Sequence, residues 1–230
     1  WQLEMARKKA RKTVIYTDSL PEKREGSVRV VIISDTHNMH EQLVLPEGDV
    51  LLHGGDFTDR GTLEEMESFA AWIGQQTFAH KIVVPGNHDI LLDEERYADI
   101  ASNWHDELQC PSDALERLRE VCTLGLHEFI DISMNDDNLR LFVSPFQPRQ
   151  PKSRFPMAFG LTRGLELKNK WKELDSVDKF SVDIVLTHTP LHRVMDVGIG
   201  DKNAGDEELL KTIRKIKPAL HVFGHIHQCR

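Results

Sequence analysis

Five apolar segments of this chain each end in a side chain that can bind a metal ion. The segments are rich in valine, isoleucine and leucine, as are strands that are buried on both faces of a sheet. They span residues 28–34, 50–53, 81–85, 182–187 and 219–224. In open α/β sheets, ligands bind outside the carboxyl ends of the strands. We therefore expect the Asp, Asn and His residues that follow these segments to meet, with Asp56 at the centre.

The residues between these segments favour an alternation of strands and helices. Thr62-Leu63-Glu64-Glu65 is a capping box, and it predicts a helix that continues to about residue 76. Such strand–helix–strand units are typical of a parallel sheet. We predict further helices over residues 91–100, 112–120, 164–174 and 206–217. We predict strands of a second, antiparallel sheet over residues 121–124, 129–133 and 139–143, and a long loop over 144–164.

Length, charge and cysteine content limit the class of protein. The chain has 230 residues, which suits one large domain. A formal charge of −8 argues against broad binding of nucleic acid. Three cysteines without a CxxC motif (Cys110, Cys122, Cys229) favour a reducing compartment, and we expect the cytoplasm. No apolar run approaches the roughly 18 residues of a membrane span.

The two ends of the chain are expected to differ from the rest. We expect residues 1–27 to be peripheral and residues 28–230 to form the domain. The basic run at 7–12 is interpreted as a solvated tail rather than a patch for nucleic acid or anionic lipid, and 14–16 as a short edge strand. Because the chain begins with Trp1 and stops three residues after His227, we expect a fragment that is truncated at its C-terminus.

The side chains at the ends of the five segments form a mixed set of oxygen and nitrogen donors. They are Asp35, His37, Asp56, Asn87, His88, His188, His225 and His227. Carboxylate, amide and imidazole together suit divalent transition metals. In Asp-x-His and His-x-His, the two side chains point the same way from a strand. Seven of these eight side chains, taken as ligands, suit two metals that share a carboxylate. Two metals about 3.5–4 Å apart polarise a phosphoryl group and generate hydroxide between them.

These motifs resemble, in order, those of the calcineurin-like metallophosphoesterases. They are Asp35-Thr36-His37, Gly55-Asp56, Gly86-Asn87-His88-Asp89, His188 and Gly224-His225-Ile226-His227. The resemblance extends over residues 28–227. It is strongest to the branch called metallophosphoesterase domain-containing proteins, through residues 33–37, 48–53 and 220–224. It implies an α/β four-layer sandwich of two mixed β-sheets flanked by helices, with a dimetal site at the carboxyl ends of the strands.

The resemblance also implies a role for each side chain. One metal would take Asp35, His37, Asp56 and His227, and the other would take Asp56, Asn87, His188 and His225. Manganese is the metal we expect, with iron, zinc, cobalt and nickel as alternatives. His88 would lie beside the phosphate as general acid or transition-state stabiliser, because an imidazole near neutral pH is suited to donate a proton. The family normally continues past Gly-His-x-His with strands that complete the second sheet.

We therefore expect a phosphodiesterase that attacks small or cyclic nucleotides with the metal-bridging hydroxide. The alternatives are a phosphomonoesterase, including a protein phosphatase, and a non-catalytic metal-binding scaffold. A nuclease is disfavoured by the negative charge, and the oligomeric state is left open. Asp59-Arg60-Gly61 resembles the phosphate-gripping motif of serine/threonine phosphatases, so Arg60 is either a phosphate contact or a plain loop residue.

The remaining histidines and the phenylalanines of the long loop have weaker signals. His192 follows His188 closely and is a candidate for lining the substrate pocket. His53 and His221 lie in apolar segments and are expected to be core or supporting groups. His40, His80, His105 and His127 are expected at the surface. Phe146, Phe155 and Phe159 either anchor the long loop or offer a platform on which a base stacks.

Overall fold

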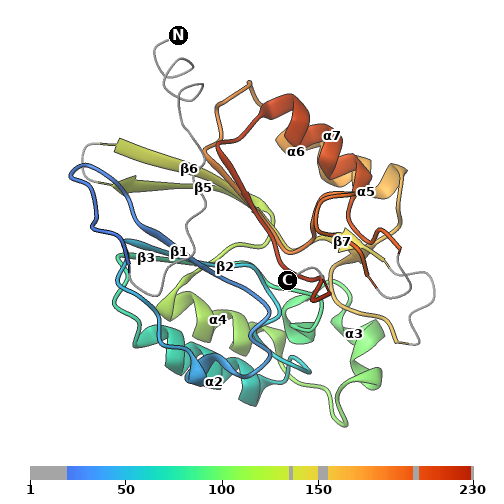
Figure 1. The fold of residues 1–230 in the computed structure, drawn as a ribbon. Coiled ribbons are helices and arrows are strands. Elements are labelled where there is room, and N and C mark those ends of the chain that lie inside the picture. The colour runs from blue at the N-terminus through green and yellow to red at the C-terminus, as the bar shows by residue number, and fades with distance from the viewer. Residues whose placement is uncertain (1–19, 135–136, 150–154, 199–201, 229–230) are drawn as a thin grey trace.

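Two four-stranded sheets pack face to face, and helices cover their outer faces (Figure 1). This is the arrangement in the computed structural model, which describes residues 20–134, 137–149, 155–198 and 202–228. The inner layer between the sheets is aliphatic, with Leu52 and Ile82 of one sheet against Leu141 and Leu186 of the other. The predicted four-layer sandwich is confirmed.

The first sheet is parallel throughout its described residues. Its strands, in spatial order, are β1 (Val30–Ile33), β2 (Val50–His53), β3 (His80–Val83) and β4 (Thr123–Leu124). The helices α2 (Leu63–Gly74) and α4 (Pro111–Val121) cover its outer face. At the start of α2, the Thr62 hydroxyl accepts from Glu65 N while the Glu65 carboxylate accepts from Thr62 N, so the predicted capping box is confirmed.

The second sheet mixes parallel and antiparallel pairs. Its order is β10 (Leu220–Val222), β9 (Ile184–Thr187), β6 (Asp137–Ser144) and β5 (Glu128–Met134). β10, β9 and β6 run parallel, and β5 and β6 form the antiparallel pair that the sequence predicts. Its outer face packs on α5 (Leu165–Lys170), α6 (Lys172–Asp175) and α7 (Glu207–Ile216). Strands β9 and β10 end on the same side as strands β1 to β3, where the candidate site lies.

Short elements connect the layers. They are η1 (His40–Gln42), η2 (Ile90–Leu92), α3 (Tyr97–Ile100), η3 (Ala101–Asn103), and the paired strands β7 (Gln147–Pro148) and β8 (Gly160–Leu161). In the described part of the chain, no helix is long and apolar enough to cross a membrane.

Several predicted elements are wrong in detail. β4 belongs to the first sheet, beside β3, and not to a second antiparallel sheet. The helix predicted over 91–100 is a 3-10 turn, a break at Asp93 and one helical turn. The helix predicted over 164–174 divides at Trp171, and Leu165, expected to be buried, is 73% exposed. The loop 144–164 contains the pair β7 and β8.

Two surface predictions are also wrong, and some residues lie outside the described part. His40 and His105 are buried. Both ring nitrogens of His105 have partners inside the fold, the Tyr97 hydroxyl and Arg60 O, whereas His40 meets the Ser68 hydroxyl through Nε2 alone. The tail 7–12, the strand predicted at 14–16 and Cys229 lie outside the described residues.

Candidate metal centre

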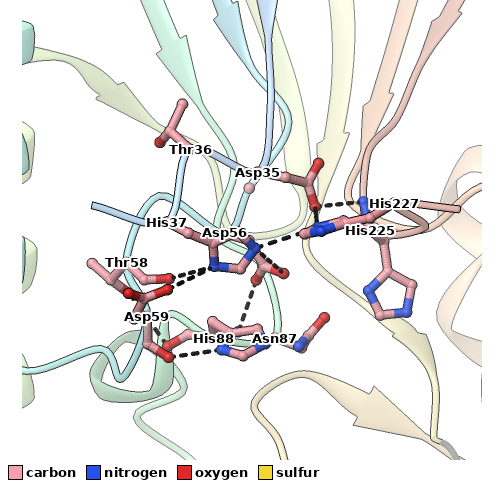
Figure 2. Close-up of polar contacts among 12 residues, drawn as sticks. Asp35, Thr36, His37, Asp56, Thr58, Asp59, Asn87, His88, His225 and His227 are labelled. Atoms are coloured by element: carbon pink, nitrogen blue, oxygen red, sulfur yellow. Dashed lines mark hydrogen bonds and ion pairs between the residues drawn. The ribbon is translucent and has the colours of Figure 1, made fainter. Parts of the chain in front are cut away.

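The candidate ligands lie on loops that leave the carboxyl ends of five strands and converge at one place (Figure 2). Backbone hydrogen bonds join these loops across the sheets. Asp35 N donates to Gly55 O at 2.8 Å, and Gly224 N donates to His188 O at 3.1 Å. Residues that are 190 positions apart in the sequence are therefore held within one hydrogen-bonded unit.

One group of side chains consists of Asp35, His37 and His227. One potential ligand atom from each lies within 4.8 Å of the others. His227 Nε2 is 3.1 Å from Asp35 Oδ1 and 3.3 Å from His37 Nε2. The Asp35 carboxylate also accepts from His225 N at 2.8 Å, which fixes the backbone at the first histidine of the last motif.

A second group consists of Asp56, His188 and His225, and its atoms also lie within 4.8 Å of one another. His188 Nε2 is 3.3 Å from Asp56 Oδ2 and 3.0 Å from Asn87 Oδ1. Asn87 therefore joins this group through its neutral oxygen. Asp56 and His188 are almost completely buried, so they meet in a region from which water is largely excluded.

Asp56 is shared between the two groups. The same oxygen that faces His188, Oδ2, lies 3.9 Å from His37 Nε2. The other oxygen, Oδ1, accepts from His88 N at 2.8 Å. One carboxylate is thus oriented by a backbone donor and lies between two sets of imidazole nitrogens.

Two histidines bind protein oxygens through Nδ1 and turn Nε2 towards the site. His188 Nδ1 donates to Gly54 O at 2.8 Å, and His37 Nδ1 donates towards Thr58 O and Asp59 Oδ1, both at 3.2 Å. A neutral imidazole that donates from Nδ1 presents a lone pair at Nε2. A histidine that binds a metal through one ring nitrogen usually donates a hydrogen bond from the other ring nitrogen in this way. The donor set therefore fits divalent cations.

Asp89 ties the loop of Asp56 to the loop of Asn87. Its side chain is fully buried. Oδ2 accepts from Asp56 N and Gly86 N at 3.0 and 2.7 Å, and Oδ1 accepts from Thr58 N and Thr58 Oγ1 at 3.0 and 2.7 Å. Burial and then the charge of Asp56 raise the pKa of Asp89 to about 7. The carboxylate thus acts as a clamp that fixes where Asp56 begins its turn.

His88 is oriented by Asp59. In Figure 2, the His88 ring lies on the opposite side of the Asp56 carboxylate from His227. His88 Nδ1 donates to Asp59 O at 2.7 Å. Its ring meets the His37 ring edge to face, with 4.9 Å between centroids. Nε2 is then the nitrogen that His88 can turn to a substrate.

Charges at the centre shift the pKa values of its members. Burial opposes protonation of His188, but the adjacent Asp56 carboxylate outweighs burial and raises the pKa of His188 to about 9. Burial likewise opposes ionisation of Asp56, and the charge of His188 more than offsets it, so the pKa of Asp56 lies below its usual range. Burial and the charge of His188 lower the pKa of His225 to about 3. The buried anion at Asp56 therefore attracts positive charge.

The backbone is strained where it presents these side chains. Asp35, His37, Asp56 and His225 have φ values of +54°, +40°, +52° and +75°. Non-glycine residues in this region cost roughly 1–3 kcal/mol each and cluster at functional sites. Gly86 has a related constraint, because a Cβ there would overlap Asp56 and lie 2.7 Å from His188 Cε1.

The two predicted substrate contacts have other partners. The Arg60 side chain is exposed, and its guanidinium donates to Trp104 O. His192 lies between Asp196 and Glu207, with N···O distances of 3.8 and 3.6 Å. Their contact with a substrate stays a prediction.

Three supporting residues were not assigned a role from the sequence. Asp89 stands in the Gly-Asn-His-Asp motif and Asp59 in Asp-Arg-Gly, so the motifs could have pointed to both. Trp104, whose ring centroid lies 5.8 Å from that of His88, carries no motif. His53, predicted to be a core or supporting group, accepts from Gly55 N at 3.2 Å and donates to Thr36 Oγ1 at 3.1 Å. Burial lowers the pKa of His53 to about 3, so it joins the two loops as a neutral group.

Comparison with known proteins agrees with the motif resemblance. A family model described as calcineurin-like phosphoesterase matches residues 28–229. Metallophosphoesterase domain-containing protein 1 of Homo sapiens is 35% identical over 214 residues, which are 90% of this chain and 62% of that protein. A UPF0046 protein of Caenorhabditis elegans is 34% identical, over 89% of this chain and 70% of its own length. This chain therefore spans less than two thirds of the human relative.

A solved crystal structure supports the fold alone. It superposes with a TM-score of 0.59 at 13% identity, over 86% of this chain and 84% of the other. The layered α/β architecture is thus shared with a protein of very different sequence.

Proposed function

This chain belongs to the calcineurin-like phosphoesterase family, and on that premise we propose that it is a phosphodiesterase that uses two divalent cations and acts on small or cyclic nucleotides. The observation that carries the proposal is the position of Asp56 between two groups of side chains that each suit one cation. The low cysteine count supports a cytoplasmic location.

The proposal assigns the same side chains that the motifs predict. One cation would be held by Asp35, His37, Asp56 and His227, and the other by Asp56, Asn87, His188 and His225. Manganese is the proposed metal, and iron, zinc, cobalt or nickel would also suit this mixture of oxygen and nitrogen donors. When bound, two such cations polarise a phosphoryl group and activate water.

His88 is the proposed general acid. Its Nδ1 is engaged with Asp59 O, so the proton available to a leaving oxygen is held at Nε2. His88 N also donates to Asp56 Oδ1, which keeps the ring beside the shared carboxylate. Asn87 places a neutral oxygen in the second group, and this leaves the cation there more electrophilic than a carboxylate would.

Hydrolysis of bis-p-nitrophenyl phosphate with added manganese tests the proposal. His88→Ala should retain its bound metal and lose roughly 10²–10⁴ in rate, the usual contribution of a general acid. Asp56→Asn should lose metal at both positions. His80→Ala is the matched control, because His80 lies at the amino end of β3 and hydrogen-bonds to Ser133 O, away from the centre. No turnover by folded wild type with any divalent metal would refute the proposal.

A phosphomonoesterase is the second candidate, and Asp59-Arg60-Gly61 is the observation that favours it. Arg60 would have to leave Trp104 O to grip a terminal phosphate. A preference for p-nitrophenyl phosphate over the diester, lost in Arg60→Ala, would favour this candidate. A non-catalytic scaffold would instead tolerate the loss of metal without any change in its binding partners.

A further inference from the structure

The indole of Trp104 stands beside the proposed general acid. Its centroid lies 5.8 Å from that of His88, and the ring planes meet at 72°. Trp104 follows η3, a segment that supplies none of the candidate ligands, and its side chain is partly exposed. An aromatic ring is therefore presented at the centre from outside the metal-binding motifs.

Three hydrogen bonds fix the orientation of Trp104. Its N donates to Ala101 O at 2.8 Å, its Nε1 donates to Pro156 O at 2.8 Å, and its O accepts from the Arg60 guanidinium. The polar edge of the indole is thus already used within the protein. What the ring still offers to a ligand is apolar π surface, held in one orientation.

Phe155 extends this surface. Its ring lies 6.3 Å from that of Trp104 at 68°, and the side chain is 41% exposed. Phe155 belongs to the long loop, whose other two phenylalanines are buried (Phe159) or half-buried (Phe146). Phe155 is the most exposed of the three, so the loop both anchors itself and contributes to an aromatic wall formed by Trp104 and Phe155.

The position of the wall relates it to the leaving group. His88 donates from its backbone N to Asp56 Oδ1 at 2.8 Å, and in Figure 2 its ring lies on the opposite side of the Asp56 carboxylate from His227. A general acid must reach the leaving oxygen in the transition state. The group attached to that oxygen must therefore lie on the His88 side, which is the side of Trp104.

We propose that Trp104, together with Phe155, contacts the leaving-group side of the substrate and selects phosphate esters that carry a planar aromatic group, such as a nucleobase. This inference rests on the proposed function, because it takes His88 as the acid. Stacking of a base on a protein aromatic contributes roughly 1–3 kcal/mol, which corresponds to about 5- to 150-fold in affinity. A ring that is already ordered makes this contact at low entropic cost.

Calorimetric titration of the manganese-loaded protein tests the inference independently of turnover. Adenosine 5′-monophosphate and ribose 5-phosphate share a phosphate and a sugar and differ in the base. We expect wild type to bind the first at least 5-fold more tightly. Trp104→Leu should reduce this preference by about 5-fold or more while the affinity for ribose 5-phosphate changes less than about 2-fold. Trp104→Phe should restore part of the preference.

Two further variants keep the test decisive. Phe155→Leu changes an exposed position and should reduce the preference even if Trp104→Leu folds poorly. Phe129→Leu is the matched control, because it replaces a half-buried ring that packs on Phe142 in the second sheet. An unchanged preference in both Trp104→Leu and Phe155→Leu, or an equal loss for both ligands, would overturn the inference. Hydrolysis of the diester by wild type, measured in parallel, tests the proposed phosphodiesterase activity separately from the role of the aromatic wall in binding.

Discussion

Asp89 joins two of the loops that present candidate ligands, and replacing it with asparagine tests how the centre is held. The substitution keeps the size of the side chain and changes one acceptor oxygen into an NH₂ donor. Asp89 Oδ2 accepts from Asp56 N and Gly86 N, and Oδ1 accepts from Thr58 N and Thr58 Oγ1. Whichever oxygen is replaced, two donors lose their acceptor.

The two orientations of the new amide differ in energy. With NH₂ in place of Oδ2, the buried N–H groups of Asp56 and Gly86 both lose a partner. With NH₂ in place of Oδ1, only Thr58 N loses its acceptor. The Thr58 hydroxyl keeps two partners, because it can accept from the new amide and donate to His88 O, 3.3 Å away. An unsatisfied buried N–H costs about 1–3 kcal/mol. The second orientation is therefore favoured, and Asp89→Asn should lower the free energy of unfolding by about 1–3 kcal/mol.

Urea unfolding at pH 8 with a chelator measures this difference without a contribution from bound metal. The change in free energy follows from the shift in midpoint and the slope. Asp99→Asn is the matched control, because Asp99 is exposed on α3 and should change stability very little. In a Thr58→Val background the rescuing hydroxyl is absent, so Asp89→Asn should cost about 1 kcal/mol more. If Asp89→Asn unfolds like Asp99→Asn in both backgrounds, the clamp does not act as described.

Three further changes have expected results. Gly86→Ala should abolish calorimetric manganese binding and lower stability by about 1–3 kcal/mol, because its Cβ would overlap Asp56; retained binding would contradict the packing. Thr62→Ala should lower the free energy of unfolding by about 0.5–2 kcal/mol through loss of the α2 cap, and an unchanged urea midpoint would contradict that role. Burial, and then the charge of Lys170, lower the pKa of His127 to about 4 in the folded protein. As the pH falls below about 6.5, His127 therefore takes up a proton in the unfolded chain but not in the folded protein. Stability should therefore fall between pH 7.5 and 5.5, and His127→Gln should reduce that fall by about 1 kcal/mol; an unchanged fall would exclude His127 as its source.

The parts of the fold that the sequence predicts correctly are those governed by local pattern. The capping box at Thr62 begins α2 because the Thr and Glu side chains satisfy backbone groups within their own turn. Likewise, Asp206 caps the start of α7, because its carboxylate accepts from Glu208 N and Leu209 N. The convergence of the candidate ligands was predictable for a related reason, since carboxyl ends of parallel strands lie on one side of a sheet.

The parts that were wrong depend on contacts distant in sequence. The helix predicted over 91–100 breaks at Asp93, whose carboxylate accepts from the Arg96 side chain and from Phe159 N at 2.6 Å. That bond spans 66 residues, and no local signal reports it. The two residues of β4 would show the same apolar pattern in either sheet, and only their pairing with Ile82 and Val83 assigns the strand to the first sheet.

The same distinction separates the ligands from the residues that hold them. The candidate ligands are all Asp, Asn or His residues, and the sequence shows such residues at or just after the end of each of the five apolar segments. Asp56 and His225 also adopt left-handed backbone conformations, each at roughly 1–3 kcal/mol, and such strain persists only where the surroundings determine it. Asp89 at the Asp56 turn and Asp35 at the backbone of His225 supply that determination through hydrogen bonds to main-chain N–H groups. Both residues stand in the motifs, but many residue types can supply such bonds from many positions, so only the strained geometry shows why the centre requires a carboxylate at Asp35 and Asp89.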